Sequence, residues 1–395
     1  MQAKDNTSRG SVSSRKVQRL QLLKAKFAGI SLQQDTLTPR AEDSTNRFTP
    51  PCCSLCPALK VYRCSLHLTT CADAKSIYTT GFREKLAQQM TEITIISAPF
   101  SGGQGKAGVD DAPEVLKQYG LVKEVESLGY SVKCTDLEFE DFEHDPVRAN
   151  MKRPRFVSSG AEKVYNAVKE GCKNGMVLTV GGDHSIGIGT VAGVLAAHPD
   201  AVVIWVDAHA DINSPAGSLS GNLHGCPVSF LVGIDGLQND PEDEFAWCPR
   251  SCLDFSRLAY VGLRDVDDFE KQIIKKHNIA AYSMHDVDRY GIAKVMEMAL
   301  ERVNPGLTRP IHLSFDVDAL DPFFAPATGT PVRGGLTWRE GCFICEAVYE
   351  TGKLVAMDLV EVNPHLGETE QQKNLTCQSG IALVKSALGQ TLLLK

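Results

Sequence analysis

The chain has 395 residues, of which 43% are hydrophobic and 23% are charged, and its formal net charge at pH 7 is -7. This composition is typical of a globular protein with a sizeable buried core. No apolar run approaches the roughly 18 residues that a spanning helix needs, which argues against a membrane-spanning protein. Lys and Arg are concentrated in residues 1–90, so the acidic charge lies on residues 91–395 and argues against general nucleic-acid binding.

Residues 1–90 differ in kind from the rest of the chain. The first 30 residues are rich in Lys and Arg, contain one acid, Asp5, and space their apolar residues over 15–27 as in a basic amphipathic helix. This pattern is typical of a mitochondrial transit peptide, and a disordered basic tail on a cytoplasmic protein is the alternative. We therefore predict a basic extension over 1–90, either disordered or a targeting segment, and a separate domain over 91–395, with mitochondrial localisation favoured.

The 13 cysteines show no disulfide spacing, and their odd number favours a reducing compartment. A zinc site built from Cys52, Cys53, Cys56 and Cys64 has no familiar spacing and is disfavoured. Cys342 and Cys345 lie in a helical pattern among apolar residues, which favours buried thiols over a redox or metal role.

From residue 92 on, strand-like apolar runs alternate with helical patterns. Strands are predicted over 93–100, 176–180, 202–206, 258–263, 311–315 and 354–360, and helices over 160–175, 286–303 and 338–349. One further helix is predicted to begin near Asp110, and another is predicted to follow residues 181–185 and to end near Ala197. The loop 101–108 satisfies G-x-G-x-x-G but precedes its helix by several residues, which favours a tight turn over dinucleotide binding. The alternation predicts an α/β fold, three-layer α/β/α, with a mostly parallel central sheet.

Four of these strands end in side chains that bind metals or charge. The residues are His184 after the second strand, Asp207, His209 and Asp211 after the third, Asp316 and Asp318 after the fifth, and Glu361 after the sixth. One such Asp alone is usually a turn former or a helix cap, but a parallel sheet brings all the carboxyl ends to one edge. Carboxylate and imidazole donors without thiolate suit Mn²⁺, Mg²⁺, Fe²⁺ or Zn²⁺, and four carboxylates among six ligands would neutralise two divalent ions.

Three segments resemble the signature motifs of the ureohydrolase family, the binuclear manganese enzymes that include arginase and agmatinase. They are GGDHS at 181–185, DAHAD at 207–211 and SFDVDALDP at 314–322. The resemblance covers roughly residues 92–390 and implies an arginase/deacetylase-like catalytic domain that binds two Mn²⁺ per subunit. It further implies that Asp207 and Asp316 bridge the ions, with His184 and Asp211 completing one site and His209 and Asp318 the other.

The segments between these motifs resemble arginases more than agmatinases. Residues 211–225 resemble the loop that holds the substrate α-carboxylate, which implies binding roles for Asn213, Ser218 and Ser220 and makes His224 the proton shuttle. Residues 262–270 resemble the segment that receives the α-amino group, here through Asp267 and Glu270, while Thr330 and Glu361 look like the residues that flank and pair the guanidinium. A threonine pair common in this loop appears here as Ser218 and Leu219.

The resemblance implies manganese-dependent hydrolysis of L-arginine to L-ornithine and urea by a metal-bridging hydroxide. Glu361 would hold the substrate cation, Asp318 would pass a proton to the leaving amine, and His224 would exchange protons with solvent. The nearer alternative is hydrolysis of agmatine or another guanidino compound, and a more distant one is a non-catalytic protein of the same fold. Arg339 and Glu340 resemble trimer-interface residues of animal-type arginases. The family's C-terminal interface tail has no counterpart after Thr391. We therefore expect a homo-oligomer, and we expect a trimeric assembly to be weakened or absent.

Overall fold

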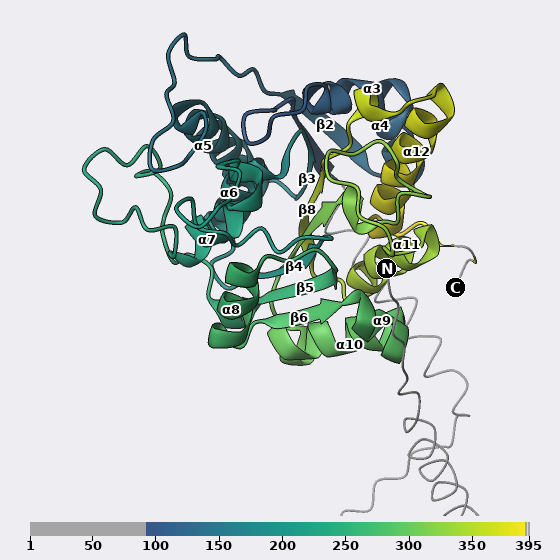
Figure 1. Cartoon of the computed structure of the whole chain (residues 1–395). Helices are drawn as coiled ribbons and strands as arrows, with labels where there is room; N and C mark the ends of the chain where they lie inside the picture. Colours follow the sequence, from purple (N-terminus) through teal and green to yellow (C-terminus); the bar gives the residue numbers. More distant parts are fainter. Residues whose placement is uncertain (1–91, 392, 394–395) are drawn as a thin grey trace, which may run out of the picture. The chain divides into compact units, whose positions relative to one another are not determined.

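A computed structural model describes residues 92–391 and 393 (Figure 1). The predictions for the basic extension and its cysteines therefore lie outside the described residues. At the centre is an eight-stranded sheet whose paired strands are all parallel, in the order β2-β1-β3-β8-β7-β4-β5-β6. The strands are β1 (Glu92–Ala98), β2 (Ser131–Asp136), β3 (Met176–Gly181), β4 (Val202–Val206), β5 (Leu258–Leu263), β6 (Ala280–Ser283), β7 (Ile311–Asp316) and β8 (Leu354–Val360).

Helices cover both faces of this sheet. One face carries α5 (Pro154–Gly171), α6 (Gly187–Ala197), α7 (Pro227–Val232) and α8 (Asp268–His277), and the other carries α3 (Ala112–Gln118), α4 (Leu121–Ser127), α9 (Met284–Tyr290), α10 (Ile292–Val303), α11 (Trp338–Glu350) and α12 (Glu370–Ala387) (Figure 1). Successive residues of β4 alternate between two cores, with Val202, Ile204 and Val206 in one and Val203 and Trp205 in the other. The predicted three-layer α/β/α architecture is confirmed. Among the described residues, no helix is both long and apolar enough to cross a membrane.

Several predicted element boundaries are wrong. The helix predicted over 286–303 is two helices, because Gly291 adopts φ 77 and ψ 152 and ends α9 before α10 begins. The helix predicted over 160–175 begins earlier, at Pro154, and ends at Gly171. The edge strand β2 was missed because it is largely exposed and has no apolar run. Cys342 and Cys345 are free, buried thiols in α11, as predicted.

The strands that end in candidate site residues are neighbours at the middle of the sheet. β3, β8, β7 and β4 are consecutive in the strand order, although β3 and β4 lie far from β7 and β8 in the sequence. Because all four run in the same direction, their carboxyl ends meet at one edge, where ligands of open α/β sheets usually bind. β5 pairs with β4 and brings the segment that follows it to the same edge.

Candidate metal centre

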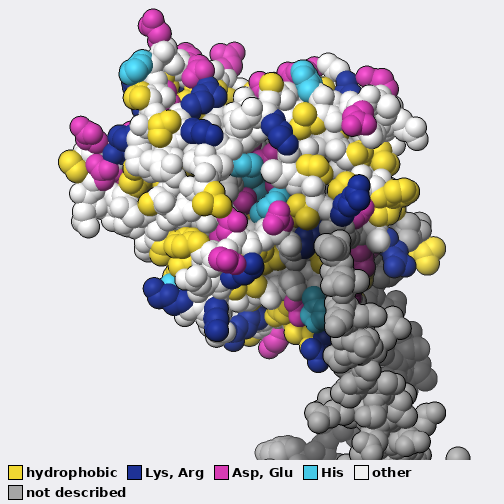
Figure 2. All heavy atoms as spheres, viewed as in Figure 1, with side chains coloured by type: hydrophobic (Ala, Val, Ile, Leu, Met, Phe, Trp, Pro, Cys, Tyr) yellow, Lys and Arg dark blue, Asp and Glu magenta, His cyan; other side chains and the backbone are white. Residues whose placement is uncertain are grey.

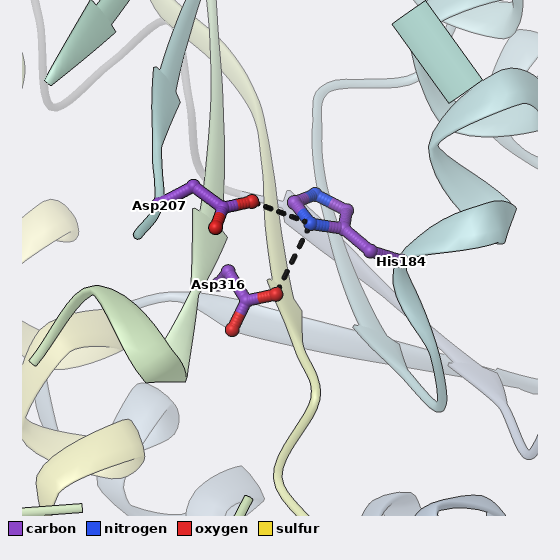
Figure 3. Close-up of side chains that lie close together, drawn as sticks. All are labelled: His184, Asp207 and Asp316. Carbon is purple, nitrogen blue, oxygen red and sulfur yellow. Dashed lines mark ion pairs between the residues drawn. The ribbon is translucent and has the colours of Figure 1, made fainter. Parts of the chain in front are cut away.

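His184 points its Nδ1 atom into a group of carboxylates. This nitrogen lies 3.2 Å from Oδ2 of Asp207, 3.2 Å from Oδ2 of Asp211 and 3.2 Å from Oδ2 of Asp316. Figure 3 shows the ion pairs from Asp207 and Asp316 meeting at the same ring nitrogen. Nδ1 is buried and makes no hydrogen bond of normal geometry with any residue that the structure describes, so the three oxygens surround this nitrogen without forming a hydrogen bond to it. Such a converging donor set fits a cation.

A second imidazole takes up the corresponding position on the other side of Asp207. His209 Nδ1 lies 3.3 Å from Asp207 Oδ1 and 3.1 Å from Asp318 Oδ2. Two groups of potential ligands therefore share Asp207, one with His184 and Asp316 and one with His209 and Asp318. The structure thus brings the six predicted ligands together, since Asp211 also lies beside His184.

The strand ends fold this way because each aspartate also closes its own turn. Asp207 Oδ1 accepts a hydrogen bond from the backbone N–H of His209 at 2.7 Å, and Asp316 Oδ1 accepts one from the N–H of Asp318 at 2.7 Å. Each of these two aspartates can therefore close its turn and also face a metal ion, because one carboxylate oxygen accepts the backbone hydrogen bond and the other faces His184. Asp211 adopts φ 51 and Glu361 φ 60, a left-handed conformation that non-glycine residues rarely adopt outside constrained sites.

The pKa values show strong electrostatic conflict among these buried groups. Burial raises the pKa of Asp211 to about 6, with the charge of Asp207 adding to the rise. Burial, together with the charges of Asp318 and Asp207, holds the pKa of Asp316 well above its ordinary value. Burial alone would lower the pKa of the His184 ring, but its contacts with Asp207, Asp211 and Asp316 raise it well above the ordinary value. A cluster in which carboxylates resist ionisation is stabilised by divalent cations, so the donor set fits hard ions of the Mn²⁺ type.

The metal ligands open into a cavity of about 260 Å³ that also holds most of the predicted substrate residues. Its walls are formed by His209, Asp211, Asn213, Ser218, Leu219, Ser220, Asn222, His224, Gly225, Asp265, Asp267, Glu270, Asp316 and Thr330. Histidine and acidic side chains gather near the middle of the face shown in Figure 2. A cavity with this many acidic groups favours a cationic ligand.

The two acids that follow β5 are engaged with the loop opposite. Asp267 Oδ2 accepts a hydrogen bond from Asn213 Nδ2 at 2.9 Å. Glu270 is only 3% exposed and accepts from the backbone N–H groups of Ile212 at 3.0 Å and Asp267 at 2.9 Å. Its burial raises its pKa to about 7. Glu270 therefore fixes the position of the Ile212 backbone and caps α8, in addition to lining the cavity.

Glu361 joins the predicted proton shuttle to the metal-type ligands. Its Oε1 lies 3.1 Å from His224 Nδ1 and accepts from the backbone N–H of His184 at 2.9 Å, whereas its Oε2 is buried with no hydrogen-bond partner among the described residues. Burial would lower the pKa of His224, but Glu361 outweighs it and the pKa rises to about 9. Thr330 Oγ1 donates to Asp318 Oδ2 at 2.9 Å.

Sequence reasoning missed several residues that hold the site in place. Trp205 stacks on the His184 ring, with centroids 4.1 Å apart, and its Nε1 donates to Asp207 Oδ2 at 3.0 Å. Asp183 accepts from the backbone N–H of Gly103 at 2.8 Å and so ties the glycine-rich loop to the centre. Asp265 lies 3.9 Å from His209 Nε2. Asp183 lies within GGDHS and Asp265 lies within residues 262–270, so both stand inside recognised segments, which was the available signal.

Comparison with known proteins agrees with this geometry. A model of the arginase family matches residues 91–389. The chain belongs to the arginase family. An arginase from Schizosaccharomyces pombe is 52% identical over 305 residues, which are 76% of this chain and 93% of that protein. The hepatic arginase of Aquarana catesbeiana is 48% identical over 300 residues, 75% of this chain and 93% of that protein.

Solved structures of the arginase family share this fold. The crystal structure of a cold-adapted arginase from the psychrophilic yeast Glaciozyma antarctica matches with a TM-score of 0.62 and 45% identity, covering 76% of this chain and 95% of that one. An arginase from Bacillus caldovelox matches with a TM-score of 0.69 and 34% identity, covering 77% of this chain and all of that one. The predicted family and fold are therefore confirmed, and the chain is a hydrolase.

Proposed function

We propose that this chain hydrolyses L-arginine to L-ornithine and urea with two Mn²⁺ as cofactors. The observation that carries the proposal is that one cavity of about 260 Å³ combines metal-type ligands with the polar groups that an α-amino acid needs. Arginases among the relatives and solved structures support the same activity.

The two ions would be held by residues that the structure brings together. One ion would be held by the group of His184, Asp211 and Asp316, the other by the group of His209 and Asp318, and Asp207 belongs to both groups. When bound, two divalent ions lower the pKa of a water held between them and so supply hydroxide at neutral pH.

The substrate guanidinium is cationic at any physiological pH and needs a fixed anionic partner. Glu361 offers one, because its Oε2 is buried without a hydrogen bond from the part of the chain that the structure describes and can accept charge-assisted hydrogen bonds. Asp318, which Thr330 holds by a hydrogen bond, would carry a proton to the leaving amine. His224 contacts Glu361 and keeps 22% of its side chain exposed, so it can exchange protons with solvent.

The other end of the cavity would bind the amino-acid portion of arginine. Asn213, Ser218 and Ser220 offer donors to the α-carboxylate, and Asp267 and Glu270 offer acceptors to the α-amino group. Agmatine has no α-carboxylate and would leave the donors of this loop unpaired, which opposes its binding.

The deciding experiment compares urea release from L-arginine and from agmatine after loading with Mn²⁺. We expect turnover of arginine and little or no turnover of agmatine. The reverse result would contradict the interpretation that residues 211–225 bind the substrate α-carboxylate. Metal analysis is the second measurement. Fewer than about one bound ion per chain after loading would contradict the binuclear centre.

Assembly and compartment belong to the same proposal. We propose a homo-oligomer, supported by the exposed Arg339 and the 42% exposed Trp338 at the start of α11. Sedimentation of the purified protein tests it. We also propose mitochondrial import, on the composition of the first 30 residues alone, and the mass of the mature N-terminus tests that.

A further inference from the structure

A buried carboxylate outside the proposed reaction lies in the middle of the sheet. Asp358 is 1% exposed within β8, between β3 and β7. Taking a carboxyl group out of water is costly unless hydrogen bonds compensate, and an apolar side chain at such a position is often more stable. An acid in the centre of a parallel sheet therefore calls for a functional reason.

Three side chains donate hydrogen bonds to one oxygen of this residue. Asp358 Oδ2 lies 2.6 Å from Thr190 Oγ1, 3.2 Å from Ser314 Oγ and 2.7 Å from His312 Nε2. The strand register pairs Ser314 of β7 with Asp358 of β8, which places both side chains on the same face of the sheet, under α6. This cluster lies directly behind the metal-type ligands.

The hydroxyl of Ser314 connects Asp358 to His184. Ser314 Oγ lies 3.0 Å from His184 Nε2. A carboxylate oxygen only accepts, and a serine hydroxyl has a single hydrogen, which it gives to Asp358. Ser314 must therefore accept from His184, so the hydrogen of the neutral imidazole sits on Nε2 and the lone pair sits on Nδ1.

That lone pair is the atom the proposed metal centre needs. Nδ1 faces oxygens of Asp207, Asp211 and Asp316, each at 3.2 Å. A ring hydrogen on Nδ1 would take the place of a metal ion. The hydrogen-bond acceptor behind Nε2 prevents this in the neutral ring, because it holds the single ring hydrogen on Nε2, the far side of the imidazole.

We propose that Asp358 is a positioning residue that acts through Ser314 to hold His184 in the tautomer whose Nδ1 is free to bind metal. The inference rests on the proposed metal centre and adds a specific hydrogen-bond direction to it. In Asp358→Asn, the amide can donate to Ser314, whose hydrogen then turns toward Nε2 and leaves the ring hydrogen on Nδ1. Ser314→Ala removes the connection altogether.

The test is Mn²⁺ affinity, measured by electron paramagnetic resonance titration of the full chain. We expect Asp358→Asn and Ser314→Ala each to weaken binding about 10- to 100-fold, the usual cost of losing an outer partner of a metal ligand. The double variant should bind Mn²⁺ about as tightly as the single variant with the lower affinity, because both changes interrupt the same chain of hydrogen bonds. Thr190→Val is the matched control. It removes another donor to Asp358 Oδ2 without touching the path to His184, and should keep the affinity within about twofold even if it lowers the melting temperature.

Each outcome has a distinct meaning. Wild-type affinity in Ser314→Ala overturns the inference, even if Asp358→Asn fails to fold. Additive losses in the double variant, or a loss in Thr190→Val that tracks its melting temperature, also overturn it in favour of a structural role. Normal Mn²⁺ binding without urea release would overturn the proposed function alone. A wild-type chain that binds no Mn²⁺ would overturn both.

Discussion

Replacing Asp211 by Asn should stabilise the metal-free protein and destabilise the manganese-loaded one. Burial raises the pKa of Asp211 from 3.8 to about 6. At pH 8 this carboxyl is ionised at a cost of about 3 kcal/mol relative to the unfolded chain, and a neutral amide of the same shape avoids that cost. At about 2 °C per kcal/mol for a domain of this size, the metal-free variant should melt about 6 °C higher. Asn also tolerates the left-handed backbone at φ 51.

The effect has a defined pH dependence. Because the pKa is raised in the folded chain, the folded state holds the proton more tightly than the unfolded state does. Stability is then full below pH 3.8 and is lost as the pH rises through about 6. The advantage of Asp211→Asn should therefore be complete at pH 8, roughly half as large near pH 5 and absent near pH 3.5.

Bound Mn²⁺ should reverse the order of the two melting temperatures, so that the wild type melts above Asp211→Asn. An ion at about 1,000 times its dissociation constant stabilises the wild type by about 4.1 kcal/mol, which exceeds the advantage of about 3 kcal/mol that the metal-free variant has, and the variant loses one ligand and most of this gain. Melting curves with Mn²⁺ and with a chelator, at pH 8 and pH 5, measure both effects, and the exposed Asp200→Asn is the control. A metal-free Asp211→Asn protein that melts at or below the wild-type temperature at pH 8 would refute the argument from charge repulsion.

Three further changes test separate contacts. His224→Asn should lower kcat for arginine by about 10²- to 10⁴-fold while leaving the Mn²⁺-induced rise in melting temperature intact; loss of that rise would mean that His224 holds the metal centre together. Asn150→Ala should raise KM for arginine with kcat unchanged, because Asn150 Nδ2 donates to the carbonyls of Pro215 and Ser218 at 2.8 Å and holds the substrate loop in place; an unchanged KM would exclude that role. Tyr260→Phe should leave the free energy of unfolding unchanged or raise it by about 1 kcal/mol, since the buried hydroxyl has no hydrogen-bond partner within the described segments. Chemical denaturation measures this, and a loss above about 1 kcal/mol would point to a hidden partner.

The amino-acid sequence determined the strands and the chemistry at their ends. The buried runs of β4 and β5 are continuous and largely apolar, and that of β8 is interrupted only by Asp358, so the positions of these strands follow from the local pattern. The Asp and His residues of DAHAD and SFDVDALDP stand immediately after such runs, and a parallel sheet has one carboxyl edge, so their convergence could also be predicted. The local sequence pattern did not predict the exposed strand β2, and it did not predict that Gly291 ends α9.

Only the tertiary structure decided which groups touch across the sheet. The strand order places β8 and β7 between β3 and β4, a non-local arrangement that no periodicity encodes. Register then sets Ser314 beside Asp358, and the turn after β3 brings His184 within 3.0 Å of that hydroxyl. In the sequence, Asp358 is one acid within an otherwise apolar strand. Its proposed role depends on Ser314, which lies 44 residues away. A hydrogen bond has a direction only when both partners are in place, so the tautomer of His184 is a property of the fold.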